Sequence, residues 1–172
     1  MLEVKNLSIA FLDSLKRRVV NNLTFSVGSG EIVALVGESG SGKSLTALSI
    51  PRLLPTGSKI LGGSVHFAGE DLFRFTNSEM SRVRGSKIGV IFQEAQSSLN
   101  PVVSIKKQIS EAFSPNVLSR EADIRRNVIT SLKDVGINEP EVMLDRYPHE
   151  FSGGMKQRVM IAIALAKNPQ LL

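Results

Sequence analysis

A short run of glycine, serine, lysine and acidic residues has the composition and spacing of a phosphate-binding loop. Its members are Gly37, Glu38, Ser39, Gly40, Ser41, Gly42, Lys43 and Ser44. The glycines allow a tight turn, so that successive backbone N–H groups converge on one anion. Lys43 is long enough to reach the β- and γ-phosphates of a nucleotide, and the Ser44 hydroxyl suits Mg²⁺. The loop therefore predicts a site for a nucleotide with Mg²⁺.

The residues on either side predict the elements that position this loop. The apolar run 31–36 has the composition of a buried strand, and 43–54 that of a helix with Pro51 near its end. That helix would add the positive end of its dipole to the site. The alternative is a Gly/Ser-rich connection that matches by accident. Chance matching of four specified positions is expected on the order of once in a hundred chains of this length, so we favour the nucleotide site.

The remainder of the chain predicts an α/β fold. Strands are expected at 2–5, 7–11, 19–27, 64–69 and 87–92, a polar turn at 13–18, a loop bracketed by 55–57 and 62–63, and a helix at 78–84. From 104 to 147 the pattern is helical, with breaks at 114–116 and 136–140, and a last helix begins near Ser152 and ends near Lys167.

Two further places carry candidate functional residues. Ser152 can cap the last helix, and Gly153 and Gly154 leave backbone amides open to a phosphate. Considered alone, this segment fits a capped helix without a ligand at least as well. Gln93 follows the strand predicted at 87–92, and its alternative is an ordinary polar residue at a strand end.

The order of these features resembles the ATPase subunits of ABC transporters, over essentially the whole chain. The resemblance implies a P-loop NTPase (RecA-like) core with an antiparallel β flank and an inserted helical subdomain. It implies a nucleotide-binding core at 1–93, the helical subdomain at 94–150, and the signature motif with its helix at 151–172.

The resemblance also implies a role for each candidate residue. Gln93 would contact Mg²⁺ and the attacking water, and would sense the transmembrane partner. Phe11 is similar to the aromatic residue that stacks on adenine, although a strand phenylalanine is equally consistent with a core position. The signature residues Ser152, Gly153, Gly154 and Met155 would contact, in trans, the γ-phosphate held by a second ATPase subunit. ATP would then hold a head-to-tail dimer together.

Several segments are similar to the branch that imports peptides or nickel: 37–48, 91–94, 98–102 and 147–150. The resemblance implies an ATP-binding subunit that couples ATP binding and hydrolysis to uptake of oligopeptides, dipeptides or nickel. The segment 94–150 would contact the permease, and a substrate-binding protein would act indirectly. The expected location is cytoplasmic, on the inner face of the cell membrane.

In this family a strand beginning near residues 168–172 leads to a Mg²⁺-binding aspartate and a catalytic glutamate, the Walker B region. The 172 residues contain neither, so the C-terminal part of the core is expected to be missing. These residues alone are expected to bind ATP weakly and to hydrolyse it negligibly, because positioned groups supply nearly all of the catalysis.

Composition excludes several other classes of function. The chain has no cysteine, which rules out disulfides and thiolate metal sites, and no apolar run near the ~20 residues of a membrane span. The net charge of +5 comes without a tryptophan and with one tyrosine for base stacking, so no nucleic-acid partner is expected. Two alternatives stay open: a non-transport ABC ATPase, and a non-catalytic nucleotide-binding remnant.

Overall fold

The computed structural model describes residues 1–12, 18–113 and 121–172, and these form two compact units. Unit 1 is Met1–Ser81 and unit 2 is Arg82–Leu172. The break predicted at 114–116 and all but Arg18 of the turn predicted at 13–18 lie outside the described residues. The division predicted at residues 93 and 150 stays a prediction.

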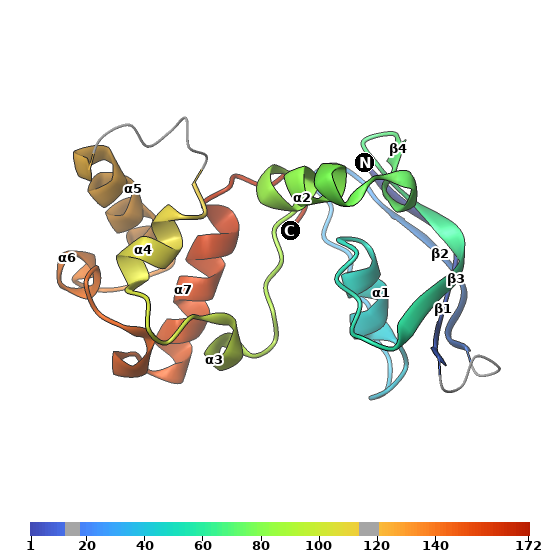
Figure 1. Cartoon of the computed structure of the whole chain (residues 1–172), viewed down its shortest axis with the longest axis horizontal. Coiled ribbons are helices and arrows are strands. Elements are labelled where there is room, and N and C mark those ends of the chain that lie inside the picture. Colours follow the sequence, from blue (N-terminus) through green and yellow to red (C-terminus); the bar gives the residue numbers. More distant parts are fainter. Residues whose placement is uncertain (13–17, 114–120) are drawn as a thin grey trace. The chain divides into compact units, whose positions relative to one another are not determined.

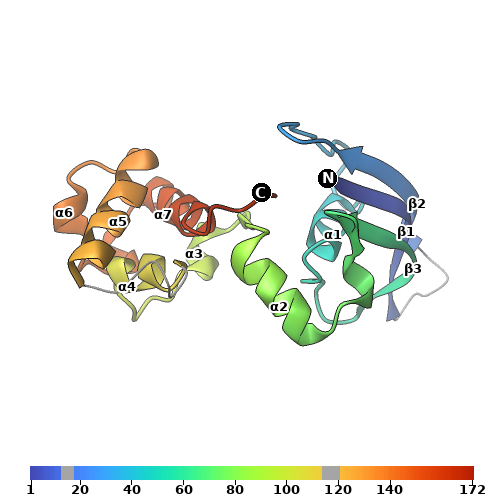
Figure 2. The same cartoon turned by 90° about the horizontal axis from the view of Figure 1, so that it is seen from above.

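Unit 1 is built on a four-stranded antiparallel sheet of order β2-β1-β3-β4 (Figures 1 and 2). Its strands are β1 (Leu2–Phe11), β2 (Arg18–Val27), β3 (Ser58–Phe67) and β4 (Glu70–Asp71). This sheet confirms the antiparallel flank of the predicted fold. The sheet buries apolar side chains that alternate along β1 and β3, among them Leu2, Val4, Val65 and Phe67.

The loop predicted between 55–57 and 62–63 is wrong from Ser58 onward, because β3 begins there and both Gly62 and Gly63 lie inside it. β1 bulges at Asn6, and Gly63 sits directly against this bulge with φ +96°. A Cβ on Gly63 would lie 2.6 Å from the Lys5 carbonyl oxygen. The glycine serves a close approach of two backbones within the sheet, a use that sequence alone does not separate from a turn.

Helix α1 (Lys43–Ser49) lies over one face of this sheet (Figures 1 and 2). It is shorter than the predicted 43–54. The helix ends at Ser49, Ile50 keeps a helical conformation, and the left-handed Arg52, with φ +56°, prevents the helix from continuing. Leu45, Thr46 and Ser49 of the helix are buried, and so is Ile50, which follows it. After the sheet, the short 3-10 helix η2 (Leu72–Arg74) leads into α2 (Asn77–Ser86).

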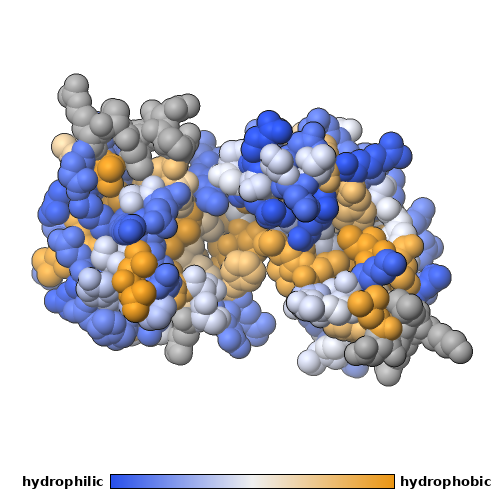
Figure 3. Space-filling model, in the orientation of Figure 1, coloured by the Kyte–Doolittle hydropathy of each residue, from blue (hydrophilic) through white to orange (hydrophobic). Residues whose placement is uncertain are grey.

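The two buried strands predicted at 31–36 and 87–92 are not found as such. Within the described residues, 31–36 has no strand partner, and Ile32 and Val36 are 97% and 89% exposed. In the second segment only Ile88 is paired, in an isolated parallel bridge to Leu171. A parallel strand is stabilised by neighbours on both sides, and an apolar run without them stays extended and exposed. Figure 3 shows apolar side chains gathered on the visible face of unit 1.

Unit 2 is helical, as expected for most of its length. It contains α3 (Ala95–Ser98), α4 (Ile105–Ser110), α5 (Glu121–Asp134), α6 (Pro140–Met143), the 3-10 helix η4 (Pro148–Glu150) and α7 (Gly153–Leu165). Side chains from α4, α5 and α7 build its core, including Ile105, Ile109, Val128, Leu132, Val159 and Ala162. Among the described residues no helix is long and apolar enough to cross a bilayer.

Candidate functional site

The loop between the extended segment 31–36 and α1 has the backbone that a phosphate site requires. Gly40 and Gly42 adopt left-handed conformations, with φ of +82° and +89°, and Gly42 caps the start of α1. A Cβ on Gly42 would lie 2.8 Å from Val20 Cγ2 and 3.0 Å from the Val19 carbonyl oxygen. Residues Val19 and Val20 of β2 therefore pack directly against Gly42, and only glycine fits at this contact.

Lys43 folds back over this loop. Its ammonium group donates to the carbonyl oxygens of Gly37 at 2.8 Å and Glu38 at 2.6 Å, and lies 3.4 Å from Ser41 Oγ. Ser44, in the first turn of α1, is exposed. A cation, the backbone N–H groups of a loop whose residues 37–41 are exposed, and a hydroxyl thus lie around one turn of backbone, a donor set that fits the phosphates of ATP. A phosphate that binds here would replace the two carbonyl oxygens as the partner of the Lys43 ammonium.

Phe11 is the last residue of β1 and is 36% exposed, so it does not belong to the buried core of unit 1. This exposure removes the core position that competed with an adenine-stacking role. The ring remains accessible for stacking, and its assignment to adenine stays a prediction.

Gln93 lies in unit 2, two residues before the start of α3. It is exposed and lines a depression of about 490 Å³ together with Phe92, Glu94, Ser97 and Ser98. Within the described part of the chain no cluster of three or more histidine and acidic side chains could hold a metal ion. The assignment of the Ser44 hydroxyl and the Gln93 amide as oxygen ligands for Mg²⁺ stays a prediction, and the two residues lie in different units.

The signature segment forms the start of α7. Ser152 caps the helix by accepting a hydrogen bond from the Met155 N–H at 3.3 Å, as its sequence predicts. Gly153 and Gly154 are exposed, and a Cβ on either would meet nothing within 4 Å. Packing inside the described chain gives no reason for these two glycines. They leave the first-turn amides of α7 open to an anion from outside.

Sequence reasoning missed the side chain that holds α7 to its neighbour. Arg158 Nη1 donates to the Val135 and Gly136 carbonyl oxygens at 2.8 and 3.0 Å, which satisfies the end of α5. Gly136, with φ +73°, is the left-handed residue that follows that helix. In the sequence, Gly136 after the apolar residues of α5 indicated the end of that helix. No sequence pattern indicated that Arg158 would bind there.

The structure thus assembles the candidate residues in two groups. The loop residues and Phe11 lie in unit 1, and Gln93 and the signature residues lie in unit 2.

Comparison of the chain with known proteins identifies its family. The ABC transporter family model matches residues 20–172. The oligopeptide transport ATP-binding protein AppD of Bacillus subtilis is 44% identical over the whole chain, which spans 53% of that protein. The peptidoglycan transport ATP-binding protein YejF of Agrobacterium fabrum is 45% identical, with 32% of its length covered.

A solved structure shares the fold as well. The dimeric ATP-binding cassette MJ0796, in a post-hydrolysis state bound to ADP and Pi, superposes with a TM-score of 0.84 at 27% identity. That match covers 98% of this chain and 71% of the cassette. The chain spans about half the length of AppD and a smaller share of YejF.

Proposed function

Because this chain belongs to the ABC transporter family, we propose that it forms the ATP-binding part of a subunit that powers peptide import. The observation that carries the proposal is the phosphate loop Gly37–Ser44, with its left-handed glycines and with Lys43 held over the turn. The relatives described above are named for oligopeptide or peptidoglycan transport, which favours a peptide-like cargo over nickel.

Each candidate residue has a place in this function. The backbone amides of the loop cradle the phosphates of ATP, and the Lys43 ammonium neutralises their charge. Ser44 and Gln93 would each supply an oxygen ligand to Mg²⁺, and Phe11 would stack on adenine. When bound, ATP supplies the phosphoanhydride bond whose hydrolysis drives transport.

The partners follow from the exposed surfaces. Ser152, Gly153, Gly154 and Met155 would meet the nucleotide of a second ATPase subunit in a head-to-tail dimer. The open space beside both glycines supports this role, as does the dimeric state of the ADP-bound cassette MJ0796. The helical segment 94–150 would contact the permease, and a substrate-binding protein would act through that permease. The subunit would lie in the cytoplasm on the inner face of the membrane.

ATPase activity is a property of the family, and these 172 residues would supply only part of it. They include the phosphate loop and the signature, whereas the family resemblance places the two carboxylates after the strand that begins near residues 168–172. In a purified polypeptide of these residues we expect ATP binding with negligible turnover, since one positioned general base contributes about 10²–10⁴-fold.

The test is ATP binding to the chain and to Lys43→Ala, measured by titration calorimetry with Mg²⁺ present. Losing charge-assisted hydrogen bonds of roughly 1.5–3 kcal/mol should weaken binding about 10–100-fold. Lys59→Ala, which removes an exposed lysine of β3, is the matched control and should leave the affinity unchanged. Equal affinities for the chain and Lys43→Ala would refute the assignment of the loop.

A further inference from the structure

Arg52 ends the phosphate-loop helix in a conformation that normally belongs to glycine. Its φ is +56°, in the left-handed region. The Arg52 N–H donates to the Ser49 carbonyl at 3.1 Å, and the Leu53 N–H donates to the Leu48 carbonyl at 2.8 Å. These two bonds are the paired closure of a Schellman motif, in which the left-handed residue is most often glycine. A strained arginine at this place persists only if the surrounding structure holds it.

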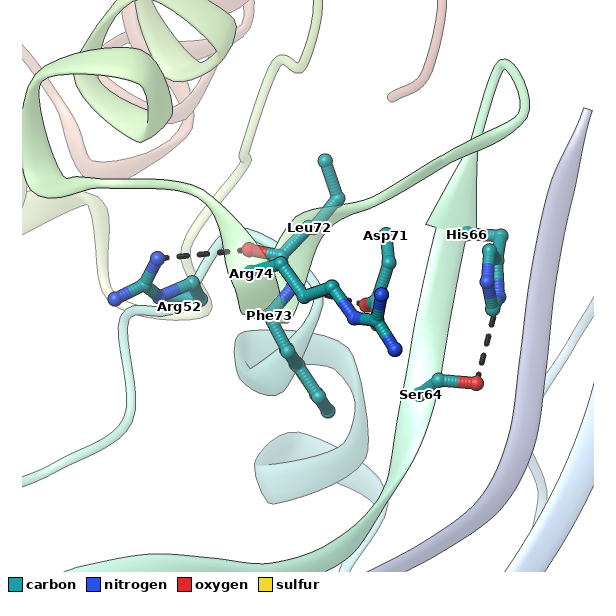
Figure 4. A network of polar contacts seen from close by, with 7 residues as sticks. All are labelled: Arg52, Ser64, His66, Asp71, Leu72, Phe73 and Arg74. Atoms are coloured by element: carbon teal, nitrogen blue, oxygen red, sulfur yellow. Dashed lines mark hydrogen bonds and ion pairs between the residues drawn. The ribbon is translucent and has the colours of Figure 1, made fainter.

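Hydrogen bonds from the Arg52 guanidinium group hold the residue in this conformation. Arg52 Nη1 donates to the Phe75 carbonyl at 2.5 Å and lies 3.5 Å from the Leu72 carbonyl, while Nη2 lies 3.5 Å from Asn77 Oδ1. Figure 4 shows the Arg52 side chain directed at the Leu72 carbonyl. One planar fork therefore reaches η2, the residue after it and the first residue of α2, a geometry that a lysine ammonium does not reproduce.

The acceptors are themselves fixed in place. Leu72 is 1% exposed and belongs to the core of unit 1. Asp71 caps η2 by accepting from the Phe73 N–H at 3.1 Å, and its second carboxylate oxygen lies 3.4 Å from Arg74 Nε (Figure 4). The groups that accept hydrogen bonds from Arg52 thus lie in a segment, 72–77, that is itself held in place. Arg52 connects the end of α1 to this segment.

We propose that Arg52 is a positioning residue, which fixes the end of α1 against 72–77 and so sets where Lys43 and Ser44 present their side chains. The helix is short, about 10 Å from end to end, and a displacement at its last turn is carried to its first. The inference rests on the proposed function, because that function assigns phosphate binding to the loop. It adds a residue outside the loop that determines the geometry of the site.

Two variants separate positioning from a role in stability alone. Arg52→Ala removes the fork and keeps the left-handed strain, whereas Arg52→Gly removes the fork and relieves that strain. Arg52→Gly should therefore unfold at a higher denaturant concentration than Arg52→Ala. If Arg52 positions the loop, both variants should bind ATP roughly tenfold more weakly than the unsubstituted chain, a usual size for coupling between sites. Arg52→Lys should fall between them and the unsubstituted chain.

Glu139→Gly is the matched control, because Glu139 is also left-handed, with φ +49°, and lies in unit 2 at the start of α6. It should leave ATP affinity unchanged. All affinities are measured where each variant is fully folded by circular dichroism. Unchanged affinity in both Arg52 variants would overturn the proposal, and so would an affinity that falls in Arg52→Ala but recovers in Arg52→Gly.

A second readout needs no nucleotide. The Ser41 N–H donates to the Glu38 carbonyl and the Thr46 N–H to the Gly42 carbonyl, so both amides report on the loop and the first turn of α1. In both Arg52 variants, hydrogen exchange at these two amides should be at least about threefold faster, while the Met155 amide in unit 2 keeps its rate. Unchanged exchange at Ser41 and Thr46 would contradict the positioning role. If the unsubstituted chain fails to bind ATP, the proposed function fails, and exchange still decides the role of Arg52.

Discussion

Gly42 is the loop residue that the rest of unit 1 constrains most closely. Gly40 and Gly42 share a left-handed backbone, but only Gly42 abuts β2, where a Cβ would collide with Val20. A Cβ on Gly40 would meet nothing within 4 Å. The two glycines therefore have different physical requirements although both belong to the same loop.

Alanine at these two positions should separate strain from collision. Gly40→Ala should cost roughly 1–2 kcal/mol of unfolding free energy, the usual penalty for a left-handed alanine. Gly42→Ala should cost more, because β2 or the start of α1 must also shift, and it should weaken ATP binding further. Urea denaturation and calorimetry on both variants measure the two effects. Equal losses in the two variants would show that β2 does not support the loop.

At the scale of elements, α7 carries exposed glycines that its own packing does not require. Ser152 already caps the helix, and the space beside Gly153 and Gly154 is open. Glycine in a helix is less favourable than alanine by up to about 1 kcal/mol, so these residues lower the stability of α7. We attribute their presence to close approach of a nucleotide from a second subunit.

Gly154→Ala should therefore raise stability and lower function. We expect the unfolding free energy to increase by up to about 1 kcal/mol, while ATP-dependent self-association of the chain weakens. Gly85→Ala in α2 is the control, because that helical glycine also has open space beside it. It should have no effect on association. Sedimentation with and without ATP gives the result, and unchanged association in Gly154→Ala would argue against the role in trans.

The helices and strands also show which parts of the structure could be predicted from the sequence. The phosphate loop, the cap at Ser152 and the antiparallel flank are local or roughly alternating patterns, and the structure contains all three. The apolar run 31–36 predicted a buried strand, but burial of such a run depends on partner strands rather than on its own composition. Arg52 and Arg158 donate to carbonyl groups that lie between 20 and 23 residues away along the chain. No local sequence pattern encodes contacts over that separation.

At the scale of the whole molecule, exposed apolar residues should govern solution behaviour. Ile32 is 97% exposed, whereas Ile9 in β1 is fully buried. An extended apolar segment without strand partners is a template for association between chains.

The same substitution at these two isoleucines should have opposite consequences. Ile32→Thr should change the unfolding free energy by no more than about 0.5 kcal/mol and should reduce aggregation measured by light scattering. Ile9→Thr should cost more than about 2 kcal/mol, since it removes core packing and buries a hydroxyl. Aggregation that persists unchanged in Ile32→Thr would mean that another surface drives it.

The central claim is that ATP binds at the loop before α1. Titration of the isotope-labelled chain with ATP and Mg²⁺, followed by amide chemical shifts, tests it residue by residue. We predict that the largest shifts fall on the amides of Gly40, Ser41, Gly42, Lys43 and Ser44, and that they saturate with increasing ATP. Saturating shifts that leave these amides unmoved, or no shifts at any ATP concentration, would contradict the account.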